Sequence, residues 1–276
     1  MKLGIWSSYY VDLSPEEAVE RFCQNGILAS ELSDEHGAML LARSEDVGKT
    51  GAEFKRFLAE RGFEMPQGHL WLKAKICSDE TAAEKLCRWI DLYEAIGIVS
   101  MVLHCDNLVG TSLSKEEKRE RNVERLGVLA EHVKDKDVTV CLENLRPHFA
   151  GEPALVDESA EDLLAIIERL GSPRFGICLD TGHLNLTLKD QRAFILAAGE
   201  RLKALHIANN DGTADQHTMP FGRGTVDFTG VVAALREIGY DGLFNLEIPG
   251  ESRIPLPLRD AKIAYVKTCY QYLMSL

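Results

Sequence analysis

The sequence lacks paired cysteines: its seven cysteines are widely spaced, and no CxxC motif occurs. An odd number of cysteines at wide spacing argues against a disulfide framework and against a thiolate zinc site. We therefore expect a reducing compartment, the cytoplasm, and cysteines that pack as small buried hydrophobes. The segment MKLGIWSSYY at the start has no long apolar run and no small-residue cleavage site, so we expect no signal peptide.

Long apolar runs and phosphate-binding loops are absent as well. No stretch approaches about 18 uninterrupted apolar residues, so we expect no membrane span. No GxGxxG or GxxxxGK(S/T) motif follows the first apolar run, which disfavours a nucleotide-binding doubly wound sheet. The formal net charge of −12 disfavours a broad nucleic-acid surface.

Short apolar runs alternate with amphipathic stretches along the chain. Eight runs are expected to be strands, at residues 3–8, 27–32, 63–71, 100–105, 138–145, 175–183, 202–210 and 243–250. Helical patterns lie between them and after the last one, among others at residues 45–61, 79–97, 115–136, 158–170, 228–239 and 258–276. Eight strands that alternate with helices over 276 residues predict one (β/α)8 TIM-barrel domain, residues 1–276. An open doubly wound sheet is the alternative.

Local signals mark several helix ends. The segment 14–17 (SPEE) offers a capping serine, a proline at the first helical position and a glutamate at the third, which predicts a helix start. Gly26, Gly62, Gly97 and Gly239 follow helical patterns, where a left-handed C-terminal cap is expected. Residues 148–157 (HFAGEPALVD) are expected to form a long loop after the fifth strand.

Metal-competent side chains recur at the predicted C-terminal ends of the strands, about one strand-plus-helix unit apart. They are Glu31, His69, His104, Glu143, Asp180 with His183, His206 and Glu247. In a barrel, residues at this period lie on one rim and point inward together, and barrel enzymes form their active sites at that rim. The pattern therefore predicts a shared site.

A divalent cation accounts for such a cluster. Buried carboxylates and imidazoles are costly when they are alone, and a cation neutralises the acids and satisfies the imidazole lone pairs. Mixed oxygen and nitrogen donors suit Mn, Mg, Co, Fe or Zn. Cys141 shares a strand face with Glu143, and Cys178 shares one with Asp180, so a small residue is expected beneath each ligand.

Plainer explanations exist for each signal. They are ion pairs inside the barrel for Glu143 and Glu247, helix capping for Asp180 and His183, core packing for His206, and an ordered turn for Asp215 and His217. Glu31 is either an orienting residue behind the ligands or an ordinary strand-end polar residue. Trp6 and Trp71 either form the wall of a ligand-binding face or pack. The histidines off the pattern are expected on the surface: His36, His132 and His148.

The loop after the seventh strand, within residues 206–228, carries a second set of polar residues. Asp215 and His217 could supply further metal ligands. Gly222 and Gly224 allow the backbone to approach a substrate closely, and Arg223 between them offers a guanidinium fork to a phosphate or carboxylate.

Five motifs surround these residues: CLENL at Glu143, CLDTGHLNL at Asp180 and His183, LHIANNDG at His206, DQHTMPFGRGTVDF from Asp215, and NLEIPG at Glu247. They resemble the sugar phosphate isomerase/epimerase superfamily, which shares its barrel with xylose isomerase and endonuclease IV. The resemblance implies one catalytic metal bound by Glu143, Asp180, His206 and Glu247. In the ketose 3-epimerase branch, it implies that the two glutamates also exchange protons with the substrate, while His183 contacts a substrate hydroxyl.

The endonuclease IV branch uses a trinuclear zinc set, and this chain has a candidate for every ligand of that set. The candidates are His69, His104, Glu143, Asp180, His183, His206, Asp215, His217 and Glu247. The flanking sequences QGHLW at His69 and LHCDN at His104 depart from the nuclease pattern. Arg223 also departs from the acidic residue common between those glycines in either branch.

The first hypothesis is a metal-dependent isomerase or epimerase of a keto-sugar, a sugar phosphate or a related hydroxy-carbonyl compound. Glu143 or Glu247 would remove a proton beside the carbonyl, and the other would return one, through an enediolate that Mn, Mg, Co or Zn stabilises. The expected substrate contacts are His183, Arg223, His69, His104 and Trp71.

Other classes stay open. The second hypothesis is a trinuclear zinc phosphodiesterase that acts on abasic DNA. A barrel that binds a ligand without catalysis is a third class, and a dehydratase or lyase could use the same scaffold. The resemblance also suggests a homo-oligomer.

Overall fold

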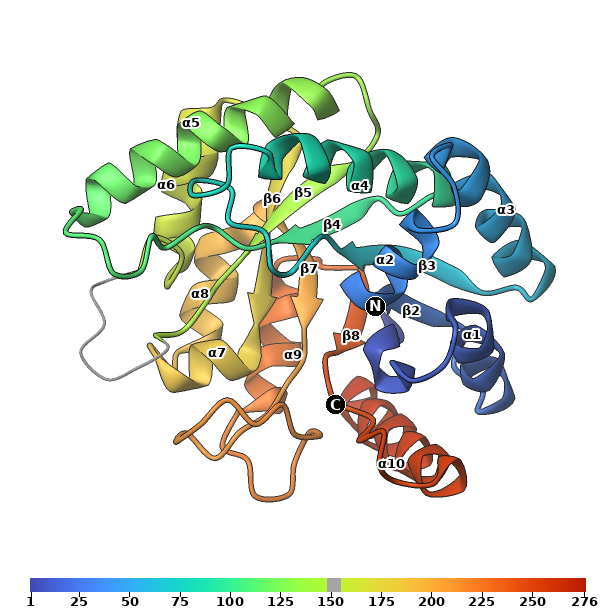
Figure 1. The fold of residues 1–276 in the computed structure, drawn as a ribbon. Coiled ribbons are helices and arrows are strands. Elements are labelled where there is room, and N and C mark those ends of the chain that lie inside the picture. The colour runs from blue at the N-terminus through green and yellow to red at the C-terminus, as the bar shows by residue number, and fades with distance from the viewer. Residues whose placement is uncertain (148–154) are drawn as a thin grey trace.

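The computed structural model of the chain describes residues 1–147 and 155–276. Its centre is a sheet of eight parallel strands, with helices packed around the outside (Figure 1). The strands are β1 (Lys2–Trp6), β2 (Ala29–Leu32), β3 (Glu64–His69), β4 (Ser100–Leu103), β5 (Thr139–Glu143), β6 (Phe175–Asp180), β7 (Leu202–His206) and β8 (Leu243–Leu246). All eight predicted strands are present. Most of the predicted loop at 148–157, residues 148–154, lies outside the described part of the chain.

The sheet closes into a barrel. Its strands pair in parallel in the order β7-β6-β5-β4-β3-β2-β1-β8. The two ends of this order meet at a bridge between Ile207 and Leu246, where Ile207 N donates to Asn245 O at 2.7 Å and Glu247 N donates to Ile207 O at 3.2 Å. The predicted (β/α)8 barrel is confirmed, and the open doubly wound sheet is excluded because its outer strands would not pair.

Helical segments separate the strands and cover the barrel. They are η1 (Ser7–Tyr10), α1 (Pro15–Gln24), α2 (Asp34–Leu41), α3 (Val47–Glu60), α4 (Ala82–Ile96), α5 (Lys115–Val133), α6 (Ala160–Leu170), α7 (Thr181–Leu186), α8 (Gln191–Ala198), η2 (Gly199–Arg201), α9 (Phe228–Glu237) and α10 (Leu256–Ser275). The six helices predicted by residue range are present, with ends shifted by a few residues. The predicted strand at 175–183 is wrong after Asp180, whose Oδ1 accepts from His183 N at 2.5 Å and starts α7.

The predicted caps are present. Ser14 and Glu17 form a reciprocal capping box at the start of α1, with Pro15 at the first helical position. Gly26, Gly62, Gly97 and Gly239 adopt positive φ angles between 60° and 99° after helical segments. These local signals determine where the helices begin and end, and therefore where the strands between them begin and end.

The barrel interior narrows to small side chains below the predicted ligands. Val102, Cys141, Cys178 and Ala204 are fully buried and pack together in one cluster. Cys141 lies two residues before Glu143 on β5, and Cys178 lies two residues before Asp180 on β6, as the alternation of strand faces predicts. This layer closes the barrel beneath the rim, so polar side chains above it are held in place by packing.

Two of the histidines predicted on the surface can be placed. His36 is fully buried, which corrects that prediction: Nδ1 lies 2.8 Å from Ser7 Oγ and Nε2 lies 3.1 Å from Leu13 O. Those two hydrogen bonds satisfy both ring nitrogens, so the imidazole is tolerated inside. His132 is partly buried beside Asp91, and the third histidine, His148, lies outside the described residues.

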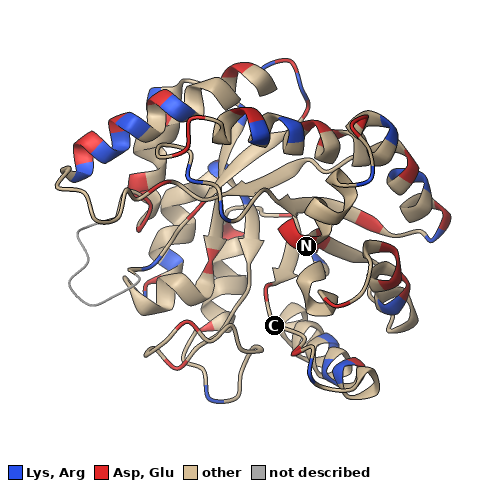
Figure 2. Cartoon of the chain, viewed as in Figure 1, with Lys and Arg blue, Asp and Glu red and all other residues tan. Residues whose placement is uncertain are grey.

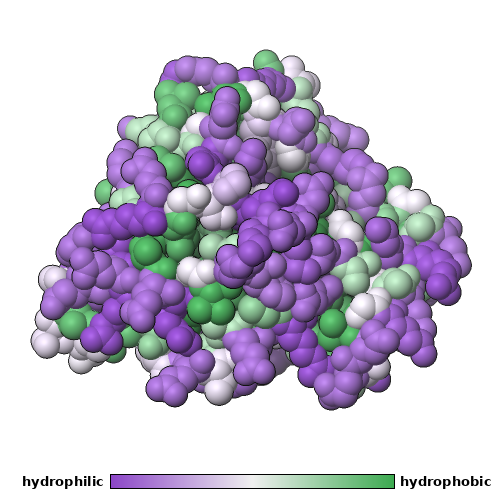
Figure 3. Space-filling model, turned by 90° about the horizontal axis from the view of Figure 1, so that it is seen from above, coloured by the Kyte–Doolittle hydropathy of each residue, from purple (hydrophilic) through white to green (hydrophobic). Residues whose placement is uncertain are grey.

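The outer surface is polar and mixed in charge. Lysine, arginine, aspartate and glutamate alternate on α5 and recur on the other outer helices (Figure 2). The face seen from above Figure 1 is dominated by hydrophilic residues, between which apolar ones are scattered (Figure 3). Among the helices of residues 1–147 and 155–276, none combines the length and the apolar character that crossing a bilayer requires.

Candidate metal centre

Four polar side chains meet above the small-residue layer, at the C-terminal end of the barrel. Glu143, Asp180 and His206 are the last residues of β5, β6 and β7, and Glu247 directly follows β8. All four are buried, and one ligand atom from each lies within 4.8 Å of the others. The rim convergence predicted from the strand-end pattern is therefore present.

Several atoms of this group have no hydrogen-bond partner among residues 1–147 and 155–276. His206 Nδ1 lies 3.1 Å from Glu143 Oε1 and 3.2 Å from Glu247 Oε2, yet its geometry makes a hydrogen bond to neither. Asp180 Oδ2 and Glu247 Oε2 are also buried without a partner. Buried polar atoms normally have hydrogen-bond partners. Two oxygens and one nitrogen without partners in one small volume are a suitable ligand set for a divalent cation.

The protonation of the acids agrees with this arrangement. Burial raises the pKa of the Glu143 carboxyl, but neighbouring imidazoles, above all that of His206, hold it well below its usual value. The same balance lowers the pKa of Glu247 to about 2. For Asp180 burial outweighs the imidazoles, and the pKa rises to about 6. The two glutamates are therefore ionised at neutral pH, whereas Asp180 is the acid that a cation would relieve most.

Two further groups adjoin the first one. His69 Nε2 and His104 Nε2 lie 3.5 and 2.9 Å from Glu143 Oε2, and these three residues form a second set of close ligand atoms. A third set joins Asp180 with His183 and His217. The structure thus brings together three adjoining groups in which Glu143 and Asp180 are shared.

Asp215 binds the third group from the loop after β7. Its Oδ2 lies 3.3 Å from His183 Nε2, and its Oδ1 lies 3.0 Å from His217 Nε2. His217 Nδ1 lies 2.9 Å from Glu247 O, and its backbone has a φ of 43°. A non-glycine residue with positive φ is held there by its surroundings, which here are these polar contacts.

A cavity of about 570 Å³ opens directly onto the centre. Its wall contains Glu143, Glu247, His104, His183, Asp215, His217, Trp6, Lys75 and Arg146. The volume is that of a small-ligand site, and the walls combine apolar area with a few convergent polar groups. Trp6 lines this cavity, which agrees with the interpretation of Trp6 as a wall of the ligand-binding face.

Trp71 and Arg223, two of the expected substrate contacts, lie outside this cavity. Trp71 lines a neighbouring hollow between α2 and α4, where Lys85 Nζ is 5.2 Å from its ring centroid. Arg223 is exposed in another hollow beside Tyr265. The next residue, Gly224, packs on Asn209, where a Cβ would lie 2.0 Å from the side chain, so this position requires glycine. Neither residue is placed to touch a ligand at the centre.

Lys75 and Arg146 are residues of the cavity that the sequence interpretation did not single out. Arg146 Nε lies 3.2 Å from Asp215 Oδ2, and Lys75 is exposed in the segment after β3. Arg146 follows Glu143 by three residues, so its position at the same strand end was the available signal. The basic groups near the centre are thus these two and not Arg223.

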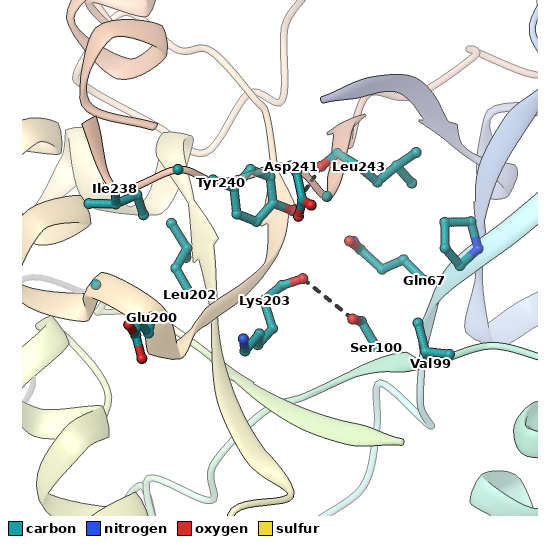
Figure 4. Close-up of a pocket in the computed structure, with 14 residues that line it drawn as sticks. Gln67, Val99, Ser100, Glu200, Leu202, Lys203, Ile238, Tyr240, Asp241 and Leu243 are labelled. Carbon is teal, nitrogen blue, oxygen red and sulfur yellow. Dashed lines mark hydrogen bonds between the residues drawn. The ribbon is translucent and has the colours of Figure 1, made fainter. Parts of the chain in front are cut away.

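A second hollow of about 410 Å³ lies at the opposite end of the barrel (Figure 4). Its lining includes Ser100 and Lys203 at the N-terminal ends of β4 and β7, and Gln67 within β3; Ser100 Oγ donates to Lys203 O at 3.4 Å. No histidine or close group of acids lines it. In barrels this end serves stability, and catalysis belongs to the C-terminal end.

Comparison with known proteins agrees with this geometry. A family model described as a xylose isomerase-like TIM barrel matches residues 24–269. The chain belongs to this family. The resemblance predicted from the motifs is thereby confirmed, and the rim cluster lies where enzymes on a barrel of this kind place their chemistry.

Relatives within this family include an uncharacterised protein of Sinorhizobium fredii, 29% identical over 177 residues, which are 62% of this chain and 53% of that protein. The L-ribulose 3-epimerase of Methylomonas sp. is 30% identical over 134 residues, 49% of this chain and 43% of that protein. The alignments thus span about half the length of these relatives.

A solved structure of D-psicose 3-epimerase in the presence of D-fructose superposes with a TM-score of 0.79 over 99% of both chains, at 16% identity. At that identity the similarity supports the barrel alone.

Proposed function

We propose that the protein is a divalent-metal-dependent isomerase or epimerase of a keto-sugar, a sugar phosphate or a related hydroxy-carbonyl compound. The observation that carries the proposal is the approach of two buried, ionised glutamates to one imidazole nitrogen beside a ligand-sized cavity. The name of one relative, the L-ribulose 3-epimerase of Methylomonas sp., supports the same class.

The residues fit proton transfer next to a carbonyl. The chemistry that a divalent cation held by Glu143, Asp180, His206 and Glu247 supplies is polarisation of a carbonyl oxygen, which acidifies the neighbouring C–H. Glu143 ends β5 and Glu247 directly follows β8, and these two strands are not neighbours in the barrel. They therefore approach the cavity from different sides, so that one can accept a proton and the other can return one.

His183 is suited to orient the substrate. Its ring lines the cavity, and Nδ1 donates to Asn144 O at 3.0 Å, which fixes the plane of the imidazole. Nε2 then faces the cavity beside Asp215, where it can meet a substrate hydroxyl. His104 and His69 lie on the other side of Glu143, and His104 lines the cavity directly.

Solvent exchange tests the reaction directly. The protein is incubated with a panel of ketoses and ketose phosphates in D₂O with Mn²⁺, Co²⁺ or Mg²⁺, and the products are analysed by NMR. Deuterium is expected at the carbon next to the carbonyl, with an epimer or an aldose as product. Activity should disappear with a chelator and return with the cation. A metal-loaded protein that exchanges no substrate proton in the whole panel would contradict the proposal.

A trinuclear zinc phosphodiesterase acting on abasic DNA is the second candidate, because the three adjoining ligand groups are what three cations would need. Metal analysis of the purified protein separates the two. One exchangeable divalent cation per chain is expected for the sugar enzyme. About three zinc ions per chain, together with cleavage of a duplex that contains an abasic site, would support the phosphodiesterase.

Lys75 tests whether the substrate has an anionic end. Lys75 lines the cavity, whereas Lys73, two residues away and also exposed, lines the neighbouring hollow. We expect Lys75→Gln to raise KM for a ketose phosphate about tenfold, since hydrogen bonds to charged groups contribute about 1.5–3 kcal/mol, with kcat little changed. Lys73→Gln is the matched control and should leave KM unchanged. Equal effects of both substitutions, or no effect of either, would argue for an uncharged substrate.

A further inference from the structure

Glu31 is a fully buried acid that the reaction outlined above does not use. It lies on β2, and its carboxylate reaches across the barrel interior to β7 and β8. Oε1 is 3.0 Å from His206 Nε2, and Oε2 accepts from Asn245 Nδ2 at 2.5 Å. Both oxygens are therefore engaged, and the carboxylate has a defined orientation.

The Glu31 carboxylate has one basic side chain as an ion-pair partner. Among the ion pairs of residues 1–147 and 155–276, Glu31 takes part in a single one, with His206. An isolated carboxylate inside a protein is costly, so a buried Glu31 needs His206 as a donor. The imidazole consequently presents its Nε2–H to Glu31, and this decides what its other nitrogen can do.

The other nitrogen, Nδ1, is the atom that faces the metal centre. With one proton held on Nε2, Nδ1 is the nitrogen that gives up its proton when a cation binds, and it points between Glu143 Oε1 at 3.1 Å and Glu247 Oε2 at 3.2 Å. No hydrogen bond uses this nitrogen within the described residues. A carboxylate behind a histidine orients the ring, selects its tautomer and makes the free nitrogen a stronger donor to a cation.

We propose that Glu31 is a positioning residue for the metal centre: it holds the Nε2–H tautomer of His206 and so directs Nδ1 to the cation. The inference rests on the metal site of the proposed function, but not on the identity of the substrate. The sequence analysis considered Glu31 as an orienting residue behind the ligands, and this proposal gives that interpretation a specific role. Asn245, buried on β8, supports the carboxylate from the side.

Glu31→Gln separates this role from a merely structural one. Glutamine has the same size and still accepts one hydrogen bond, but it has no charge. The metal-free variant should melt below the metal-free wild type, because the amide NH2 faces one of the two donors that Glu31 accepts from. Circular dichroism shows whether its fold is kept. Its affinity for Mn²⁺, Co²⁺ or Zn²⁺, measured by competition with a chromophoric chelator, should fall about 10- to 100-fold. The visible spectrum of the Co²⁺ protein should also change, since the imidazole donor is reoriented.

Gln67 provides the matched control. It pairs in register with Glu31, is buried in the barrel, and its side chain donates to a backbone oxygen, Leu205 O, at 3.2 Å. Gln67→Met should change the melting temperature of the metal-free protein while the metal affinity and the Co²⁺ spectrum stay as in the wild type. This comparison shows whether any buried polar substitution weakens the site.

The outcomes are distinct. A wild-type chain that binds no divalent cation would remove the metal centre itself, and with it both proposals. A wild-type chain that binds tightly, with Glu31→Gln binding equally tightly and showing the same Co²⁺ spectrum, would overturn the role of Glu31 alone. Weaker binding by Glu31→Gln with normal binding by Gln67→Met supports it.

Discussion

Replacing either Glu143 or Glu247 with glutamine is expected to reduce kcat on the order of 10²- to 10⁴-fold, the usual contribution of a positioned acid or base. Both carboxylates are buried beside the cavity and have lowered pKa values, so both are ionised and able to take a proton at neutral pH. An amide keeps the size and one ligand oxygen but accepts no proton. The loss should therefore appear in kcat with the fold preserved, as followed by circular dichroism.

Asp211→Asn supplies the control for this acid-to-amide change. Asp211 is exposed in the loop after β7, where its carboxylate accepts from Thr213 and Gln216 and lines no part of the cavity at the centre. Turnover should stay within a factor of about two, because surface substitutions away from the site change little. Near-normal turnover in both glutamate variants, with metal content unchanged, would eliminate the assigned acid and base.

Proton exchange can also tell the two glutamates apart. If each serves one face of the substrate, Glu143→Gln and Glu247→Gln should each retain slow deuterium exchange with a different epimer. The reason is that the remaining carboxylate still removes the proton that points toward it. Equal loss of exchange with both epimers would assign both steps to one residue.

The barrel and the convergence of the strand-end polar residues at one rim could be predicted from the sequence because both follow from strand periodicity. A polar residue at the end of each apolar run must reach the same rim once the sheet closes, wherever the helices lie. The prediction from strand periodicity was wrong where one side chain both ends a strand and caps the next helix. Asp180 ends β6 as a rim residue and also caps α7, so a run that reads as a strand through residue 183 becomes helical at 181.

Loop residues could not be placed in the same way. Arg223 has the right chemistry for an anion, but it is exposed and lines a different hollow from the cavity at the centre. Lys75 and Arg146 enter the cavity from segments without a repeating pattern. His36 is tolerated inside because Nε2 donates to Leu13 O and Nδ1 accepts from the Ser7 hydroxyl, and no periodicity in the sequence predicts such tertiary partners.

Binding of the cation is expected to raise the melting temperature by about 8–16 °C. A ligand at about 1,000 times its dissociation constant stabilises the folded state by about 4.1 kcal/mol, and each kcal/mol shifts the melting temperature of a domain of this size by about 2–4 °C. The cation can satisfy the unpartnered atoms of Asp180, His206 and Glu247 only in the folded chain, where they converge. The unfolded chain therefore does not gain this stabilisation. Calorimetry with excess Mn²⁺ or Co²⁺ and with a chelator measures the difference.

Asp180→Asn should separate the helix cap from the proposed binding of the cation. Asparagine still caps a helix but carries no charge. The pKa of Asp180 is raised by burial from 3.8 to about 6, so the folded chain holds this proton more tightly than the unfolded chain does. Stability of the metal-free protein therefore falls as the pH rises through that range. At neutral pH the metal-free variant should melt at or above the wild type, while the increment from the cation should be lost.

Asp46→Asn is the matched control, since Asp46 caps α3 by accepting from Lys49 N at 2.9 Å and is far in sequence from every ligand. This variant should keep the full increment from the cation. The contrast distinguishes the loss of a cap from the loss of a ligand, because both substitutions convert a capping aspartate to the amide. A full increment in Asp180→Asn would mean that the cation is held without this carboxylate, and the four-residue site would have to be redrawn.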